Sequence, residues 1–128
     1  MRRILVVEDS PVNMVLTVAV LEHAGHSVLQ AEDATQGLQI AQAQQPDLVL
    51  MDIQLPDIDG LVATRMLKAD PRTAHIPVIA LTAFAMPSDE DDTRAAGCDG
   101  FVTKPIRYKD FLVAVEAMMK RRAAAAPH

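Results

Sequence analysis

Five short apolar runs alternate with segments of helical length along this chain, and this alternation restricts its fold more than any other feature. The runs occupy residues 4–7, 27–31, 48–51, 78–81 and 101–102. Each is too short for a helix, is rich in Val, Ile or Leu, and is bounded by polar or turn-forming residues, which is typical of buried strands. Because helical segments separate the runs, we expect parallel strands joined by right-handed crossovers. The pattern predicts a three-layer, doubly wound α/β sandwich.

The helical segments are predicted from their length, their spacing and their capping residues. Asp33 is suited to cap the start of one helix, and Gly25 and Gly97 to end two others. In the last segment, apolar residues from Phe111 to Met119 recur at helical spacing. The predicted helices span residues 11–24, 33–44, 59–68, 88–96 and 107–122. A length of 128 residues suits one domain, at 1–122, followed by a disordered tail at 123–128.

The composition supports a buried parallel sheet and excludes several kinds of partner. Hydrophobic residues make up 50% of the chain but aromatic residues only 3%, so Val, Leu, Ile, Met and Ala supply the apolar mass. A formal net charge of -5 argues against a DNA-binding surface. No apolar run approaches the roughly 20 residues of a membrane span. The single cysteine, Cys98, cannot form an internal disulfide, so we expect a cytoplasmic protein.

The residues that follow the predicted strands carry acidic, hydroxyl and amino groups. Ligands of open parallel sheets bind beyond the carboxyl ends of the strands, so these groups are expected at one edge. Glu8 and Asp9 follow the first strand, Asp52 the third, Thr82 the fourth and Lys104 the fifth. Isolated acidic residues in such places are ordinarily helix caps or solvated charges. Their joint placement at one edge favours a functional site.

Three carboxylates at one edge repel one another, and a divalent cation removes that repulsion. Oxygen ligands without His or Cys select a hard ion, which predicts Mg²⁺, with Mn²⁺ as an alternative. With the metal bound, one carboxylate can attack a phosphoryl group. Asp52 is the best-placed nucleophile because the third strand is central in such sheets, while Glu8 and Asp9 form a chelating pair. The sequence therefore predicts chemistry through an aspartyl phosphate.

Four segments, taken in order, resemble the receiver domains of two-component response regulators. They are residues 4–10 with the acidic pair, 48–60 with Asp52, 78–83 with Thr82, and 101–105 with Lys104. The resemblance covers about residues 3–120, nearly the whole chain. It implies a flavodoxin-like (βα)5 fold whose five parallel strands have the order 2-1-3-4-5. It also implies a phosphorylation switch in the bacterial cytoplasm, not an enzyme with an independent substrate.

By position, the resemblance implies a role for each residue around the predicted metal. Asp52 is implied as the phosphoacceptor and as a metal ligand. Asp9 and the backbone carbonyl of Gln54 are implied as further direct ligands. Glu8 stands where many members carry Asp, and its longer side chain is expected to bind the metal mainly through water.

The resemblance also implies a conformational switch. Thr82 and Lys104 would hold the phosphoryl group. The peptide bond between Lys104 and Pro105 resembles the cis peptide of the family, a turn that aims the lysine. When Thr82 moves toward the phosphoryl group, it vacates space into which Phe101 turns, and this remodels the surface of the fourth helix and the fifth strand.

The first predicted helix carries apolar residues on two sides. One stripe is expected to pack on the sheet: Leu16, Val20 and Ala24. The opposite side is expected to face water and, with Pro105, to form a docking patch: Met14, Val15 and Val18. In this family the first helix meets the phosphodonor. A charge at Val18 is therefore expected to impair transfer from the donor protein but not from a small donor molecule.

The implied partners are a sensor histidine kinase or a histidine phosphotransfer protein as donor, and a downstream protein effector, with no DNA and no membrane. Two alternatives stay open: a monomer or a phosphorylation-dependent dimer, and a stand-alone regulator or a receiver excised from a larger hybrid kinase or regulator. A haloacid-dehalogenase-like phosphohydrolase is disfavoured, because Gln54 stands where such enzymes carry a general acid. A flavin-binding module is disfavoured by a content of one Tyr and no Trp.

Overall fold

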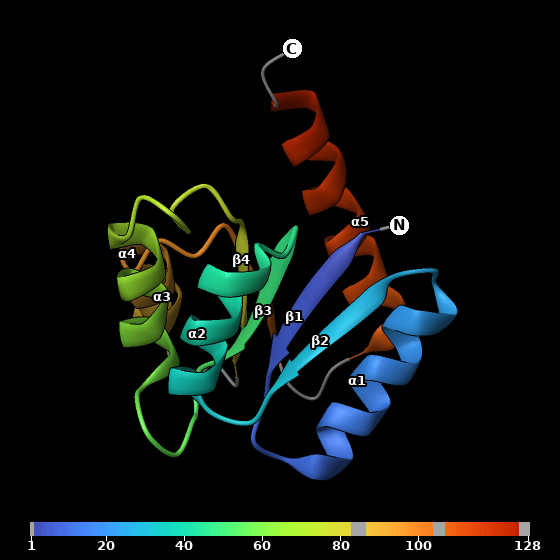
Figure 1. Cartoon of the computed structure of the whole chain (residues 1–128), viewed down its shortest axis with the longest axis horizontal. Coiled ribbons are helices and arrows are strands. Elements are labelled where there is room, and N and C mark those ends of the chain that lie inside the picture. Colours follow the sequence, from blue (N-terminus) through green and yellow to red (C-terminus); the bar gives the residue numbers. More distant parts are fainter. Residues whose placement is uncertain (1, 83–86, 104–106, 126–128) are drawn as a thin grey trace.

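The computed structural model describes residues 2–82, 87–103 and 107–125 of the chain. Strands and helices alternate along it (Figure 1). Their bounds are β1 (Arg3–Val7), α1 (Pro11–His23), β2 (Ser27–Ala31), α2 (Ala34–Gln44), β3 (Leu48–Asp52), α3 (Gly60–Ala69), β4 (Val78–Thr82), α4 (Pro87–Ala95), β5 (Gly100–Thr103) and α5 (Tyr108–Ala125). The five strands are parallel and have the order β2-β1-β3-β4-β5. Both the doubly wound α/β fold and the strand order are confirmed.

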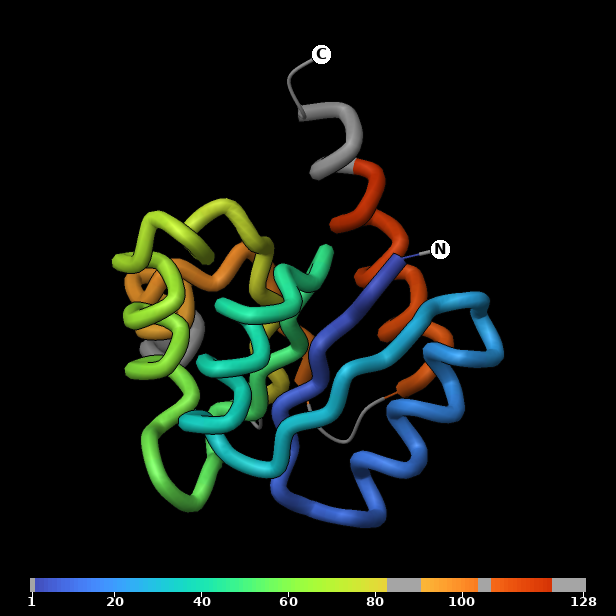
Figure 2. Tube along the Cα trace, in the orientation of Figure 1, coloured from blue at the N-terminus to red at the C-terminus, as the bar shows by residue number. Residues whose placement is uncertain are grey.

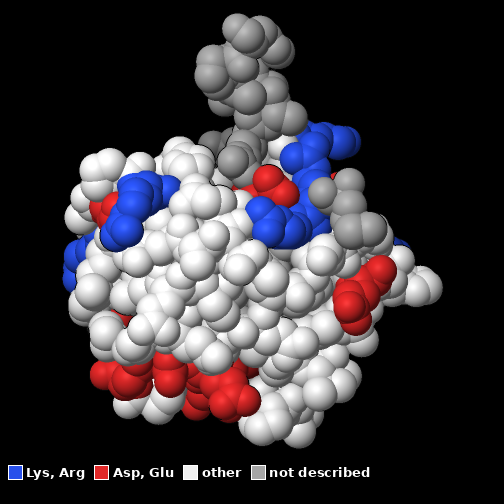
Figure 3. All heavy atoms as spheres, viewed as in Figure 1, with Lys and Arg blue, Asp and Glu red and all other residues white. Residues whose placement is uncertain are grey.

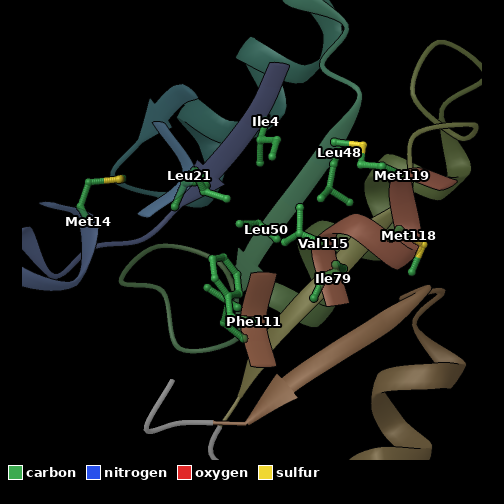
Figure 4. Close-up of a cluster of buried hydrophobic side chains, with 12 residues drawn as sticks. Ile4, Met14, Leu21, Leu48, Leu50, Ile79, Phe111, Val115, Met118 and Met119 are labelled. Atoms are coloured by element: carbon green, nitrogen blue, oxygen red, sulfur yellow. The ribbon is translucent and has the colours of Figure 1, made fainter. Parts of the chain in front are cut away.

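Helices cover both faces of the sheet, which explains why its strands are continuous apolar runs. Successive strand residues point to opposite faces. Ile4 and Val6 belong to a core cluster shared with α1 and α5, whereas Leu5 and Val7 belong to a cluster shared with α2 and α3. Figure 4 shows the first cluster, in which the fully buried Phe111 of α5 packs with strand residues. The sheet is therefore the middle layer of the predicted sandwich.

All strands run toward one edge of the molecule. The loops that leave β1, β2 and β3 lie along that edge, away from the start of β1 (Figure 2). This is the carboxyl edge, at which the sequence predicts the site. Across the described ranges, we find no helix with both the length and the apolar content needed to span a membrane.

Side chains cap the starts of α1, α2 and α3. The Asp33 side chain accepts a hydrogen bond from the Gln36 backbone N–H at 2.8 Å, which confirms the predicted N-cap of α2. The Ser10 hydroxyl accepts from the Asn13 N–H at 3.4 Å and caps α1. Gly25 follows the end of α1 with a φ of 95°, a conformation that glycine adopts without strain.

Helix α1 is rotated relative to the prediction. The prediction of which α1 residues pack on the sheet is wrong for Leu16, which is 46% exposed, and for Ala24, which is exposed. The residues that α1 buries are Met14, Thr17 and Leu21. Apolar residues occur nearly all round this helix, and the inward stripe includes a threonine. The hydrophobic pattern therefore could not identify the buried face.

Helix α5 is longer than predicted. It continues to Ala125, three residues beyond the predicted end of the helix at 122. Alanine has the highest helix propensity of all residues, and positions 123–126 are all alanine. A run of this kind extends a helix that is already formed. Residues 126–128 lie outside the described part of the chain.

Candidate metal centre

The carboxylates of Glu8, Asp9 and Asp52 meet at the carboxyl edge of the sheet. Val7 of β1 pairs with Met51 of β3, so the next residues, Glu8 and Asp52, lie side by side at the ends of the two strands. One carboxylate oxygen from each of the three acidic residues lies within 4.8 Å of the others. Glu8 and Asp52 are each 2% exposed, whereas Asp9 is exposed. The structure thus brings together the three acidic residues that the sequence assigned to this edge.

The donor set of this cluster fits a hard divalent cation. All of its side-chain ligand atoms are carboxylate oxygens, and burial of Glu8 and Asp52 strengthens the repulsion between like charges. A few carboxylates, completed by a carbonyl and waters, suit Mg²⁺. Figure 3, which has the same view as Figure 1, shows acidic side chains at the edge where the strands end. A cation bound by the cluster of three carboxylates would offset the repulsion between them.

Thr82 lies on the strand next to the acidic cluster. It is the last residue of β4 and is 8% exposed. Leu81, the residue before it, pairs with Asp52 of β3. Thr82 therefore stands one position beyond the level of Asp52, toward the carboxyl edge. This placement is compatible with a hydroxyl that donates to a group bound at Asp52.

The other predicted switch residues are described in part. Phe101 is half-buried in β5 and pairs with Ala80 of β4, two positions before Thr82. Lys104 and Pro105, with the cis peptide predicted between them, lie outside the described residues.

Gly60, the first residue of α3, lies against the backbone of Asp52. A Cβ atom at this position would come within 2.1 Å of the Asp52 carbonyl oxygen and 2.7 Å of Ile53 Cα. The Gly60 N–H donates to the Ile53 carbonyl at 2.9 Å. In the sequence, this glycine belongs to the segment 48–60 that resembles the receiver family, but no structural role was predicted for it.

Asp57, in the loop between β3 and α3, binds the start of α2. Its carboxylate accepts from the Ala34 N–H at 2.9 Å, from the Thr35 N–H at 3.0 Å and from the Thr35 hydroxyl at 2.7 Å. These bonds, the Thr35 hydroxyl foremost, hold the pKa of Asp57 well below its usual range. Sequence reasoning missed Asp57, because its partners lie more than twenty positions away and no local pattern connects them.

The predicted docking patch on α1 is altered by the rotation of the helix. Met14 was expected to face water, but it is 7% exposed and belongs to the core, so this part of the prediction is wrong. Val15 is 67% exposed, as predicted, and Val18 is half-buried. Val12 and Leu16 are also exposed. The exposed apolar surface of α1 is therefore centred on Val15.

Comparisons with known proteins agree with this architecture. The family model of the response regulator receiver domain matches residues 4–116. The polar-differentiation response regulator DivK of Brucella anthropi is 39% identical over 118 residues, which are 92% of this chain and 96% of that protein.

Two solved structures illustrate the structural similarity. One is the receiver domain of a sensor histidine kinase from Pseudomonas aeruginosa, with a magnesium ion coordinated in its active-site cleft. It has 34% identity and a TM-score of 0.86, over 93% of this chain and 98% of that one. The other is a CheY-like receiver domain protein from Methanospirillum hungatei, with 25% identity and a TM-score of 0.91, over 98% of this chain and 99% of that one. With the family model matching most of its length, this chain belongs to the response regulator receiver domain family, the phosphoacceptor modules of two-component signalling.

Proposed function

We propose that this protein accepts a phosphoryl group from a phosphohistidine onto Asp52, with Mg²⁺ bound by Asp9, Asp52 and the Gln54 backbone carbonyl, and by Glu8 mainly through water. The observation that carries the proposal is the meeting of three carboxylate oxygens within 4.8 Å of one another around the buried end of β3. A buried cluster of like charges is unfavourable without a compensating cation. The magnesium ion in the related kinase receiver domain supports the choice of metal.

In this proposal Asp52 is the nucleophile. One of its carboxylate oxygens forms the new bond to phosphorus, the bond between phosphorus and the imidazole nitrogen breaks, and the nitrogen keeps the electron pair. The Gln54 N–H donates to Asp52 Oδ1 at 2.9 Å and so sets the rotation of the carboxylate. Mg²⁺, when bound, neutralises charge on the transferring oxygens. The Thr82 hydroxyl and the Lys104 ammonium are assigned to the phosphoryl oxygens.

The output of the proposed reaction is a change of surface. Movement of the Thr82 hydroxyl toward the phosphoryl group would let Phe101, now half-buried, turn inward beside β4. The faces of α4 and β5 would then differ between the two states, and a downstream protein would bind one of them. In this role the protein is a switch in the bacterial cytoplasm and turns over no independent substrate.

The direct test is phosphorylation of the metal-free protein by acetyl phosphate, with and without Mg²⁺, followed by mass spectrometry. We expect a gain of one phosphoryl group when Mg²⁺ is present, located on the peptide that contains Asp52. With excess chelator the gain should fall to background. An adduct that forms equally well without metal, or that maps to another residue, would contradict the proposal.

The exposed apolar surface of α1 is the proposed contact for the donor protein. Its residues are Val12, Val15 and Leu16, with Val18 at its border. Because the first helix meets the phosphodonor in this family, we assign these residues to the contact with a histidine kinase or a histidine phosphotransfer protein. Contiguous exposed apolar residues of this kind commonly mark interaction sites.

Val15→Glu is expected to slow phosphotransfer from a phosphorylated histidine phosphotransfer protein by about tenfold or more, since a charge buried in an apolar contact is costly. Phosphorylation by acetyl phosphate should be unchanged. Val113→Glu on α5 is the matched control, because Val15 is 67% and Val113 is 68% exposed. Equal loss with both donors, or equal loss in both variants, would count against docking at α1. Val15 replaces Val18 as the position to test because Val18 is half-buried.

A further inference from the structure

We propose that Asp57 is a positioning residue of the metal centre: by binding the first turn of α2, it holds the β3–α3 loop in the conformation that presents the Gln54 carbonyl to the cation. The inference rests on the proposed function, because this carbonyl is a ligand only if Mg²⁺ binds at this edge. Gln54 and Asp57 belong to the same short loop, so a displacement of one moves the other.

The first turn of α2 offers a well-defined anchor for this loop. The first N–H groups of a helix have no partner within the helix and need side chains or water. Asp33, which precedes the helix, accepts from the Gln36 N–H. Asp57, which comes from a different loop, accepts from the Ala34 and Thr35 N–H groups. The two carboxylates thus divide the donors of one helix end, and the helix dipole favours both charges.

The two ends of the β3–α3 loop are fixed by other contacts. At its start, the Ile53 N–H donates to the Leu81 carbonyl at 3.1 Å, and at its end the Gly60 N–H donates back to Ile53. Between these points, Leu55 and Ile58 pack against the core cluster on the α2 and α3 face. Apolar packing is non-directional, so these contacts by themselves do not fix the position of the loop along α2.

Hydrogen bonds, in contrast, have a required geometry. The three bonds of Asp57 therefore fix where the middle of the loop lies along α2. A ligand carbonyl binds the ion more tightly when it is held in place before the ion arrives, because ordering it afterwards reduces the affinity. Asp57 supplies that order although it is not one of the three carboxylates of the cluster.

Coupling between two sites is reciprocal. If the contact of Asp57 with α2 favours the conformation that binds Mg²⁺, then Mg²⁺ must favour the contact. The Ala34 and Thr35 amides report on it directly, because Asp57 accepts from both. We expect saturating Mg²⁺ to slow hydrogen exchange at these two amides in the unsubstituted protein, by about fivefold for a typical coupling.

The decisive experiment compares Asp57→Ala with Asp33→Ala in the full chain. Both remove one exposed or half-buried carboxylate from the same helix end, but only Asp57→Ala detaches the loop. Mg²⁺ affinity is measured by titration calorimetry of the metal-free proteins, and amide exchange by NMR. We expect Asp57→Ala to raise the Mg²⁺ dissociation constant about fivefold more than Asp33→Ala. Thr35→Val, which removes the hydroxyl donor alone, should give a smaller shift in the same direction.

The outcomes distinguish failure of the positioning role of Asp57 from failure of the proposed function. Equal shifts of Mg²⁺ affinity in Asp57→Ala and Asp33→Ala would overturn the positioning role, since helix capping and net charge would then explain both. Exchange at Ala34 and Thr35 that does not respond to Mg²⁺ in the unsubstituted protein would overturn it without any variant. If the unsubstituted protein fails to bind Mg²⁺, the proposed function itself fails, and the inference fails with it.

Discussion

Asp52→Asn is expected to abolish the Mg²⁺-dependent phosphoryl adduct while the fold is kept. The asparagine side chain has nearly the shape of aspartate and retains an oxygen that can accept from the Gln54 N–H. It lacks the carboxylate that attacks phosphorus in the proposed reaction, so the adduct should fall to background with acetyl phosphate and with a phosphohistidine donor alike. Intact-mass spectrometry measures the effect, and far-UV circular dichroism checks that the variant is folded.

The same variant should also be more stable than the unsubstituted protein when metal is absent. Glu8, Asp9 and Asp52 place three carboxylates within 4.8 Å, and two of them are buried. Removing one like charge at this distance relieves about 1 kcal/mol of repulsion or more, which corresponds to a rise of about 4 °C in Tm. Mg²⁺ should raise the Tm of the unsubstituted protein more than that of Asp52→Asn.

A phosphoryl adduct that persists in Asp52→Asn would show that Asp52 is not the phosphoacceptor.

Gly60→Ala is expected to destabilise the fold by about 3 kcal/mol or more and to reduce phosphorylation in the fraction that remains folded. The added Cβ would meet the Asp52 carbonyl oxygen at 2.1 Å, and because that atom belongs to the backbone it cannot rotate aside. Either α3 or the end of β3 must move. Since Asp52 is the last residue of β3, the movement displaces this proposed phosphoacceptor and the carboxylates beside it. Urea unfolding and the acetyl phosphate reaction measure the two effects.

Gly25→Ala provides the control for Gly60→Ala. Gly25 has a positive φ of 95°, but a Cβ there meets nothing within 4 Å. Its substitution should cost about 1 kcal/mol through backbone strain alone and should leave phosphorylation unchanged. If Gly60→Ala behaved like Gly25→Ala in both measurements, close packing of α3 on Asp52 would not be needed for the site.

Much of the fold could be predicted from local pattern. Strands buried on both faces read as continuous apolar runs, and the observed strands match the predicted ones to within about two residues. Asp33 was identified as a cap because its partner, Gln36, is only three positions away. The acidic cluster followed from position as well, because parallel strands bring their carboxyl ends to one edge. The prediction of the strand order had another basis, since it came from the family resemblance and not from periodicity.

What the sequence determined by itself is therefore what depends on near neighbours in the chain: the elements, their order along it, and the set of chemical groups at the ends of the strands. Only the tertiary structure decided which face of α1 is buried, since apolar residues surround that helix and the packing of Met14 and Leu21 selected one side. It also decided that Gly60 lies on the backbone of Asp52 and that Asp57 binds α2. Such contacts join residues that are not near neighbours in the chain, and they stabilise the protein only after the sheet has brought the loops together.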